Sequence, residues 1–208
     1  PEAFTEVRYI AHHKQMQALK VIPQIAEQFK GIFGRDSGGL ISTYRADDAD
    51  TLIVTLGSVI GTISEVIDEM RDKGQKIGAV TIRSFRPFPL DEIHEILKNT
   101  RRVVVFEKCL AVGLGGIVAS NVRMAHRGLT SPVYAVIGGL GGRPITQASL
   151  RELFQKAMAD DLEETTFLDL KQDVVNHEMD RDEKFTRPGA VAENVLRQIG
   201  VVDVAKTT

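Results

Sequence analysis

Residues 101–125, RRVVVFEKCLAVGLGGIVASNVRMA, contain the pattern that decides the fold. The apolar run at 103–106 is typical of a strand that is buried on both faces. A glycine-rich turn follows, and from Ile117 to Ala125 apolar residues recur at the spacing of a helix that lies on a sheet. Strand, glycine turn and helix form the repeating unit of a parallel α/β sheet. We therefore expect further copies of this unit on both sides of it.

The sequence on either side repeats this unit. Short apolar runs predict strands at residues 52–56, 77–84 and 132–137, and a helix is predicted after each of them. The first helix ends near Gly74, Asp91 is predicted to cap the second, and the last spans residues 146–158 with Thr146 as its N-cap. These elements predict an α/β fold with three layers, in which a mostly parallel sheet is flanked by helices.

The chain divides into three parts. Residues 1–45 are interpreted as a linker helix and connector from an upstream domain, with Pro23 marking either a kink or the start of a second helix. Residues 46–160 contain the α/β units. Residues 161–208 are a C-terminal extension, with an edge strand or a surface segment at 167–170 and a short helix after Pro188.

The composition excludes several classes of protein. The net charge of −2 over 208 residues argues against a basic nucleic-acid surface. No apolar run approaches the roughly 18–20 residues that span a bilayer, so we expect no membrane insertion. The single cysteine, Cys109, cannot form an internal disulfide, an iron–sulfur cluster or a multi-cysteine zinc site. We expect a cytoplasmic location.

Two glycine clusters invite a ligand interpretation. The cluster at 113–116 lacks the third glycine of the dinucleotide fingerprint, because Val118 stands in its place, and this favours a tight strand-to-helix turn. The cluster at 138–143 ends in Gly141, Gly142 and Arg143, and free backbone amides there can hold a carboxylate or phosphate. The same residues can form a close-packed loop at a domain or subunit contact, which we favour.

Two further arginines follow a predicted strand. In the segment RSFRPFP, Arg83 and Arg86 stand at the carboxyl end of the strand, the edge where α/β sheets bind ligands and partners. They can bind an anion or pair with carboxylates of a neighbouring protein. The alternative is a loop that is fixed by the prolines and packed by the phenylalanines.

The sequence contains no catalytic constellation. The five histidines are scattered without metal-ligand spacing, and Cys109 has no histidine near it in the sequence. Neither a G-x-S-x-G motif nor a P-loop occurs. We therefore assign no catalytic, cofactor-binding or metal-binding residue to this chain.

The segments at 51–89, 101–122 and 136–146 together resemble one known family. They are similar to the C-terminal domain of the alpha subunit of pyruvate:ferredoxin oxidoreductase, which is itself similar to the C-terminal domain of transketolase. The resemblance covers about residues 12–160 and is strongest at LGS (56–58), RPFP (86–89) and GLGGR (139–143). Pro144 departs from the acidic residue that the family pattern has after GGR.

The resemblance implies an enzyme that lies mostly outside this chain. It implies thiamine-diphosphate-dependent oxidative decarboxylation of pyruvate, or of another 2-oxoacid, with coenzyme A, giving acetyl-CoA and passing electrons to ferredoxin. Thiamine diphosphate, magnesium and iron–sulfur clusters are then expected in other parts of a hetero-oligomer with beta, gamma and delta subunits. This chain is expected to act as a scaffold and subunit contact and to be inactive alone, with Arg83, Arg86 and Arg143 at interfaces.

A second hypothesis treats the chain as a separate binding module. In this interpretation the loops at 113–116 and 138–143 bind an anion or a nucleotide. Such a module gains thermal stability from its ligand by mass action, whereas a scaffold domain does not. Contact of coenzyme A with this domain in the assembled enzyme is a third interpretation.

Overall fold

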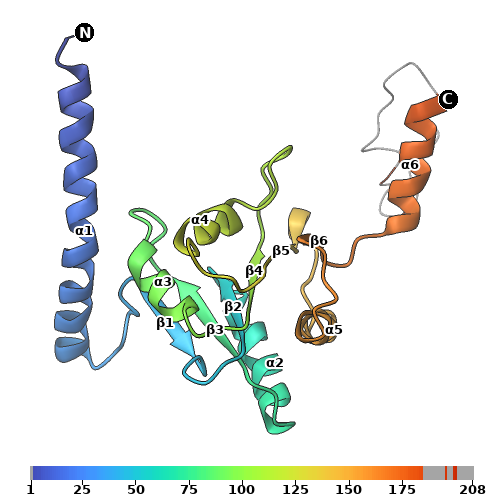
Figure 1. The fold of residues 1–208 in the computed structure, drawn as a ribbon, viewed down its shortest axis with the longest axis horizontal. Coiled ribbons are helices and arrows are strands. Elements are labelled where there is room, and N and C mark those ends of the chain that lie inside the picture. Colours follow the sequence, from blue (N-terminus) through green and yellow to red (C-terminus); the bar gives the residue numbers. More distant parts are fainter. Residues whose placement is uncertain (1, 185–194, 196–198, 201–208) are drawn as a thin grey trace. The chain divides into compact units, whose positions relative to one another are not determined.

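The computed structural model describes residues 2–184, 195, 199 and 200. The chain divides into two compact units, Pro1–Leu168 and Asp169–Thr208. The first unit contains the sheet and most of the helices (Figure 1). In the second unit the structure describes helix α6, Gln172–Lys184.

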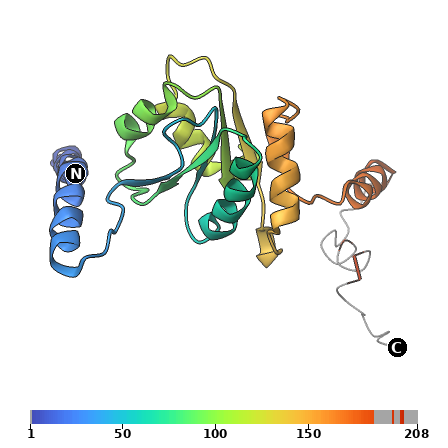
Figure 2. The same cartoon turned by 90° about the horizontal axis from the view of Figure 1, so that it is seen from below.

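The first unit is built on a six-stranded sheet with the strand order β1-β3-β2-β4-β5-β6. Every neighbouring pair is parallel except β1 with β3, which is antiparallel. Helices cover both faces of this sheet, so the predicted three-layer, mostly parallel α/β fold is confirmed (Figure 2). The strands are β1 Ile41–Tyr44, β2 Thr51–Thr55, β3 Ile77–Ile82, β4 Arg102–Glu107, β5 Val133–Ile137 and β6 Thr165–Phe167.

Two hydrophobic clusters lie on opposite faces of the sheet. Helices α2 (Ile60–Asp72) and α5 (Gln147–Met158) pack on one face, and α3 (Leu90–Leu97) and α4 (Ile117–Ala125) pack on the other. Strand β4 serves both clusters, because Val104 and Phe106 point to the first face while Val103 and Val105 point to the second. Its continuous apolar run is therefore buried on both sides, as the sequence predicts.

Of the two predicted N-caps, the structure confirms one and contradicts the other. The amide of Ser149 donates to Thr146 Oγ1 at 3.1 Å, so the predicted N-cap of α5 is confirmed. The predicted cap Asp91 is wrong: α3 begins at Leu90, its N-cap is Pro89, and no side chain caps it. Asp91 lies in the first turn instead, where its negative charge interacts favourably with the positive end of the helix dipole.

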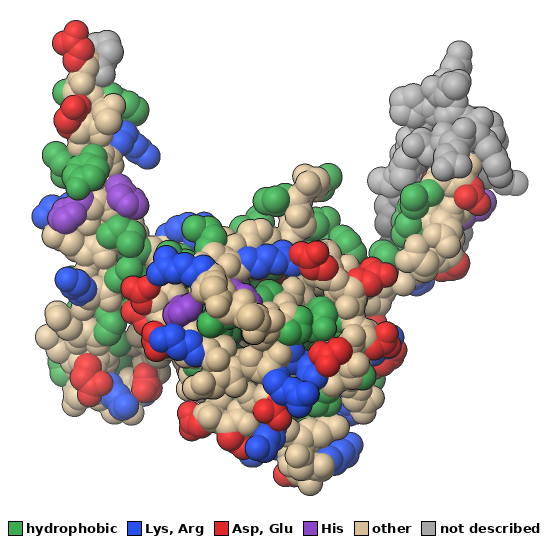
Figure 3. All heavy atoms as spheres, in the orientation of Figure 1, with side chains coloured by type: hydrophobic (Ala, Val, Ile, Leu, Met, Phe, Trp, Pro, Cys, Tyr) green, Lys and Arg blue, Asp and Glu red, His purple; other side chains and the backbone are tan. Residues whose placement is uncertain are grey.

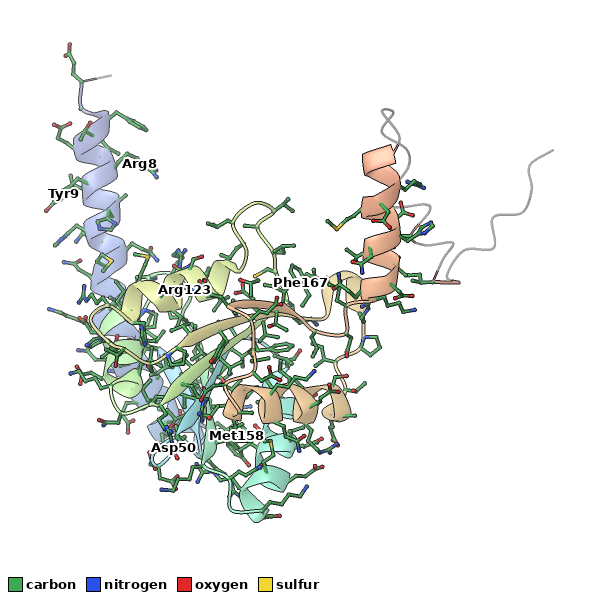
Figure 4. All side chains as sticks on the ribbon, turned by 45° about the vertical axis from the view of Figure 1, so that its right-hand side comes forward. Arg8, Tyr9, Asp50, Arg123, Met158 and Phe167 are labelled. Atoms are coloured by element: carbon green, nitrogen blue, oxygen red, sulfur yellow. The ribbon has the colours of Figure 1, made fainter. Side chains whose placement is uncertain are left out.

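The segments outside the α/β units differ in detail from the expectations. Helix α1 runs from Phe4 to Phe33 as one helix with Pro23 inside it, and none of its residues is buried. Figure 4 shows Arg8 and Tyr9 pointing outward from this helix, and Tyr9 is exposed. The edge strand β6 lies two residues earlier than the predicted 167–170 and pairs with β5. The helix predicted after Pro188 begins outside the described residues.

Candidate interface at the carboxyl edge of the sheet

The carboxyl ends of five parallel strands, β2 to β6, meet at one edge of the sheet. The loops that follow β2, β3, β4 and β5 line this edge. It is the edge at which open α/β sheets bind ligands and partners. All five residues predicted from the sequence to make contacts lie in two of these loops: Arg83, Arg86, Gly141, Gly142 and Arg143.

The structure divides these five residues into two separate groups. Strands β2 and β4 lie between β3 and β5 in the sheet. Three strand spacings of about 4.8 Å put the ends of β3 and β5 roughly 14 Å apart. Arg83 and Arg86 therefore follow one strand of the sheet, and Arg143 follows another strand that lies three strand spacings away.

The two aromatic residues in the loop after β3 pack against each other. Phe88 is buried, and the ring of Phe85 meets it edge-on with the ring centroids 5.9 Å apart. The guanidinium of Arg86 lies over the Phe85 ring at 4.2 Å and donates to the Phe85 carbonyl at 2.7 Å. The alternative of a loop fixed by its own packing thus accounts for the phenylalanines, while Arg86 remains exposed.

Arg83 lies beside the connector that precedes β1. Its side chain packs against Gly38, where a Cβ atom would lie 3.1 Å from Arg83 Nε. The neighbouring Asp36 accepts from the Gly38 amide at 2.7 Å and pairs with Lys30 at 3.2 Å. These two partners, the amide first, hold the pKa of Asp36 below its usual range, with a smaller contribution from Arg83. Arg83 itself is exposed.

The glycine cluster after β5 forms a tight turn of its own. Gly139, Gly141 and Gly142 adopt φ values of 72°, 63° and 81°, which favour glycine. The amide of Gly142 donates to the Gly139 carbonyl at 3.3 Å, and that of Arg143 donates to the Leu140 carbonyl at 3.2 Å. Two of the backbone amides that could have bound an anion therefore donate within the turn. This favours the interpretation of the loop as a domain or subunit contact.

Strand β4 ends in a buried carboxylate to which the sequence patterns assign no role. Glu107 is buried, and its Oε2 accepts from the amide of Val118 at 2.8 Å while its Oε1 accepts from the amide of Ala119 at 2.9 Å. These amides belong to the first turn of α4, so Glu107 fills the anion site of that helix. A Cβ atom at Gly116 would overlap Glu107 Oε1. The helix N-terminus thus has no room for a ligand phosphate, which weighs against nucleotide binding at 113–116.

A sequence signal for this carboxylate does exist. Glu107 directly follows the apolar run 103–106 in a strand that is buried on both faces, and an acidic residue is rarely buried without a partner. Its partners lie 11 and 12 residues further along the chain. Only the folded turn brings them to it.

The lone cysteine lies against the same carboxylate. The thiol of Cys109 donates to Glu107 Oε2 at 2.9 Å. Burial, and then the hydrogen bond and negative charge of Glu107, raise the pKa of Cys109 to about 11. This raised pKa keeps the thiol protonated at neutral pH, and the protonated form is a poor nucleophile.

The described part of the chain has neither a cluster of metal-binding side chains nor a membrane-spanning helix. Within residues 2–184, 195, 199 and 200, no group of three or more His, Cys, Asp or Glu side chains is placed to hold a metal ion. No helix in the described part of the chain is long and apolar enough to cross a membrane.

Comparisons with known proteins identify relatives of this fold. Residues 49–150 match the family described as pyruvate:ferredoxin oxidoreductase core domain II. The pyruvate synthase subunit PorA of Methanosarcina barkeri is 34% identical over 182 residues, which cover 84% of this chain and 45% of the relative. The ketoisovalerate oxidoreductase subunit VorA of Pyrococcus horikoshii is 34% identical over 164 residues, covering 78% of this chain and 40% of the relative.

The chain thus spans less than half the length of these curated relatives. A weaker likeness in structure is to an inactive tetramer of a split-gene transketolase, with a TM-score of 0.45 and 21% identity. It covers 54% of this chain and 39% of that chain.

Proposed function

We propose a function on the premise that this chain belongs to the pyruvate:ferredoxin oxidoreductase family, whose core domain II matches residues 49–150. This membership confirms the resemblance inferred from the LGS, RPFP and GLGGR segments. The chain is a scaffold and subunit-contact domain of a 2-oxoacid:ferredoxin oxidoreductase. The complete enzyme decarboxylates pyruvate oxidatively with coenzyme A, forms acetyl-CoA and passes the electrons to ferredoxin.

The observation that carries the scaffold role is the chemistry of the carboxyl edge. Its buried carboxylate, Glu107, is engaged by the α4 amides and the Cys109 thiol, so it is not free to act on a substrate. The groups that the edge leaves exposed include arginines, glycines and aliphatic side chains, together with Lys108 and Ser58. Arginine and aliphatic side chains suit a protein contact. The domain therefore supports the reaction by holding other parts of the enzyme in place.

The cofactors of the proposed enzyme do not fit this chain. A single cysteine cannot ligate an iron–sulfur cluster, and the free helix amides that hold a diphosphate are satisfied at α4 by Glu107. Thiamine diphosphate, magnesium and the clusters are therefore assigned to other parts of the complex. There thiamine supplies the chemistry that stabilises the carbanion after decarboxylation.

The substrate and the partners follow from the same family. Relatives are named for pyruvate and for ketoisovalerate, and the RPFP and GLGGR segments lead us to propose pyruvate. The partners are the beta, gamma and delta subunits, with ferredoxin and coenzyme A at the level of the complex, in the cytoplasm.

The domain organisation is part of this proposal. Residues 1–45 connect the domain to the preceding part of the subunit and add β1 to its sheet, residues 46–160 form most of the transketolase-like domain, and residues 161–208 add β6 and form an extension.

The test is purification of the complex through an affinity tag on this chain. We expect the other subunits to co-purify and the complex to reduce ferredoxin in the presence of both pyruvate and coenzyme A. The chain alone is expected to be inactive in the same assay. A tagged chain that recovers no other subunit, or a complex that oxidises no 2-oxoacid, would contradict the proposal.

A further inference from the structure

The loop between β4 and α4 exposes two large aliphatic side chains. Val112 is 93% exposed, the highest value among the large hydrophobic side chains of the described residues, and Leu114 is 73% exposed. Figure 1 shows this loop projecting from the sheet edge, and Figure 3 shows hydrophobic side chains at its tip. We call residues 110–115 the aliphatic loop. Neither the scaffold role nor the glycine pattern by itself explains these two side chains.

The aliphatic loop is held in one conformation by its own backbone. Ala111 and Gly115 form a bridge in which each amide donates to the other's carbonyl at 2.8 Å. The amide of Leu114 also donates to the Ala111 carbonyl, at 2.9 Å, and Gly113 and Gly115 adopt positive φ values. The two aliphatic side chains are therefore presented on a tight turn, so ordering them on binding costs little conformational entropy.

The base of the loop is fixed as well. Glu107 holds Cys109 on the strand side and the amides of Val118 and Ala119 on the helix side. One buried carboxylate thus joins both ends of the loop to the sheet. The turn projects from a rigid base.

The composition of the loop suits an apolar pocket. Residues 109–122 contain no charged side chain, so the loop and the start of α4 carry no charge that a nonpolar partner would have to desolvate. The exposed Lys108 stands directly before this range. Interface centres are depleted of charge in the same way. A loop exposed only to water normally carries polar residues instead.

The relatives contain a portion of sequence that this chain does not match. More than half of the PorA and VorA sequences has no counterpart in this chain. In the proposed enzyme that portion would belong to the same subunit as this chain, next to it in the sequence. We propose that Val112 and Leu114 dock into an apolar pocket on that portion of the alpha subunit. This inference rests on the proposed function, because it requires the chain to be part of the oxidoreductase.

Site-specific photo-crosslinking in the assembled oxidoreductase tests the assigned pocket. The photoreactive residue p-benzoylphenylalanine is placed at Val112 and, as a control, at Thr130. Thr130 is exposed in the loop before β5, at the opposite edge of the sheet. After irradiation, mass spectrometry identifies the peptide joined to each position. We expect position 112 to crosslink to the portion that PorA relatives have and this chain lacks, at least about tenfold more than position 130.

Other crosslinking results overturn the proposal. A crosslink from position 112 to a second copy of this chain or to a different subunit would refute the assigned pocket. Equal, low crosslinking from both positions in an active complex would refute docking by the loop while leaving the proposed function intact. If the wild-type chain joins no oxidoreductase at all, both fail together.

A pair of serine substitutions gives an independent measurement. Val112→Ser with Leu114→Ser removes the aliphatic contact without touching the core, so the thermal unfolding midpoint of the chain should not change. We expect recovery of the remaining enzyme parts with the tagged chain to fall at least about tenfold, as for central interface residues. The matched control, Thr130→Ser, should recover them fully. Full recovery with the double variant would overturn the inference.

Discussion

The two glycine-rich loops at the carboxyl edge look alike in sequence. They differ in the group that accepts hydrogen bonds from the first-turn amides of the helix that follows each loop. After β4, the first turn of α4 is capped by Glu107, a buried charged residue from the preceding strand. After β5, the first turn of α5 is capped by Thr146, a neutral and exposed residue next to the helix. Glycine content alone therefore does not identify an anion site. What matters is whether another group already satisfies the helix amides.

The largest expected effect comes from removing the buried cap. Glu107→Ala leaves the amides of Val118 and Ala119 buried without an acceptor and opens a void against Gly116. We expect a loss of about 3 kcal/mol in the free energy of unfolding, measured by urea denaturation. Glu107→Gln keeps the volume and one acceptor, and should lose less. If Glu107→Ala unfolds at the wild-type urea concentration, the carboxylate is not the cap that the structure indicates.

The second effect concerns the thiol that shares this carboxylate. Because the pKa of Cys109 is raised to about 11, its thiolate fraction at pH 8 should be about 100-fold below that of an ordinary cysteine. Its alkylation by iodoacetamide should be slower by a similar factor and accelerate as pH rises toward 11. Reaction at the rate of a free cysteine at pH 8 would show that Glu107 and burial do not protect the thiol.

The same pKa makes a signed prediction about stability. The folded state holds the thiol proton more tightly than the unfolded state, so this contribution is fully present below the ordinary cysteine pKa. It is lost as pH rises from about 9 toward the folded value of about 11. Urea denaturation across this range should show a smaller decline for Cys109→Ala than for the wild type.

A smaller effect is expected at the second loop. Thr146→Ala removes only a neutral, exposed cap, so the free energy of unfolding should fall by about 1 kcal/mol. Thr146→Ser retains the hydroxyl and serves as the matched control. A loss at Thr146 equal to that at Glu107 would remove the distinction between the two loops.

The smallest effect on stability is expected at the exposed arginines. Arg83→Ala, Arg86→Ala and Arg143→Ala should leave the unfolding midpoint nearly unchanged, since substitutions at exposed positions seldom alter stability. They should instead weaken assembly with the other subunits, which analytical ultracentrifugation can measure. Unchanged affinity in all three variants would exclude these arginines from the interface.

The sequence predicts the buried strands and the helices that cover them better than it predicts the edges. Residues 103–106 are apolar on both faces, and the run leaves few alternatives to a central strand. Strand β1, ISTY, was not predicted, because it is short, half-exposed and lacks an apolar pattern. Helix α6 was not predicted for a similar reason, since its sequence is strongly polar.

Long-range contacts explain the remaining differences. The role of Glu107 depends on amides more than ten residues away, which no local pattern reveals. The separation of Arg83 from Arg143 depends on the strand order, because β2 and β4 are placed between their strands. The placement of Arg83, Arg86, Gly141, Gly142 and Arg143 at a protein contact stays a prediction.

The central claim is that the carboxyl edge of this domain contacts protein and does not bind a cofactor. The most direct test is the thermal unfolding midpoint of the chain with thiamine diphosphate and magnesium, with coenzyme A, and with a nucleotide, each at 1 mM, compared with the purified partner subunits. A ligand with a dissociation constant of 10 μM would stabilise the chain by about 2.7 kcal/mol at that concentration. We expect no shift of the midpoint with any small molecule and a clear rise with the partner subunits. A saturable rise with one of the small molecules would contradict the central claim.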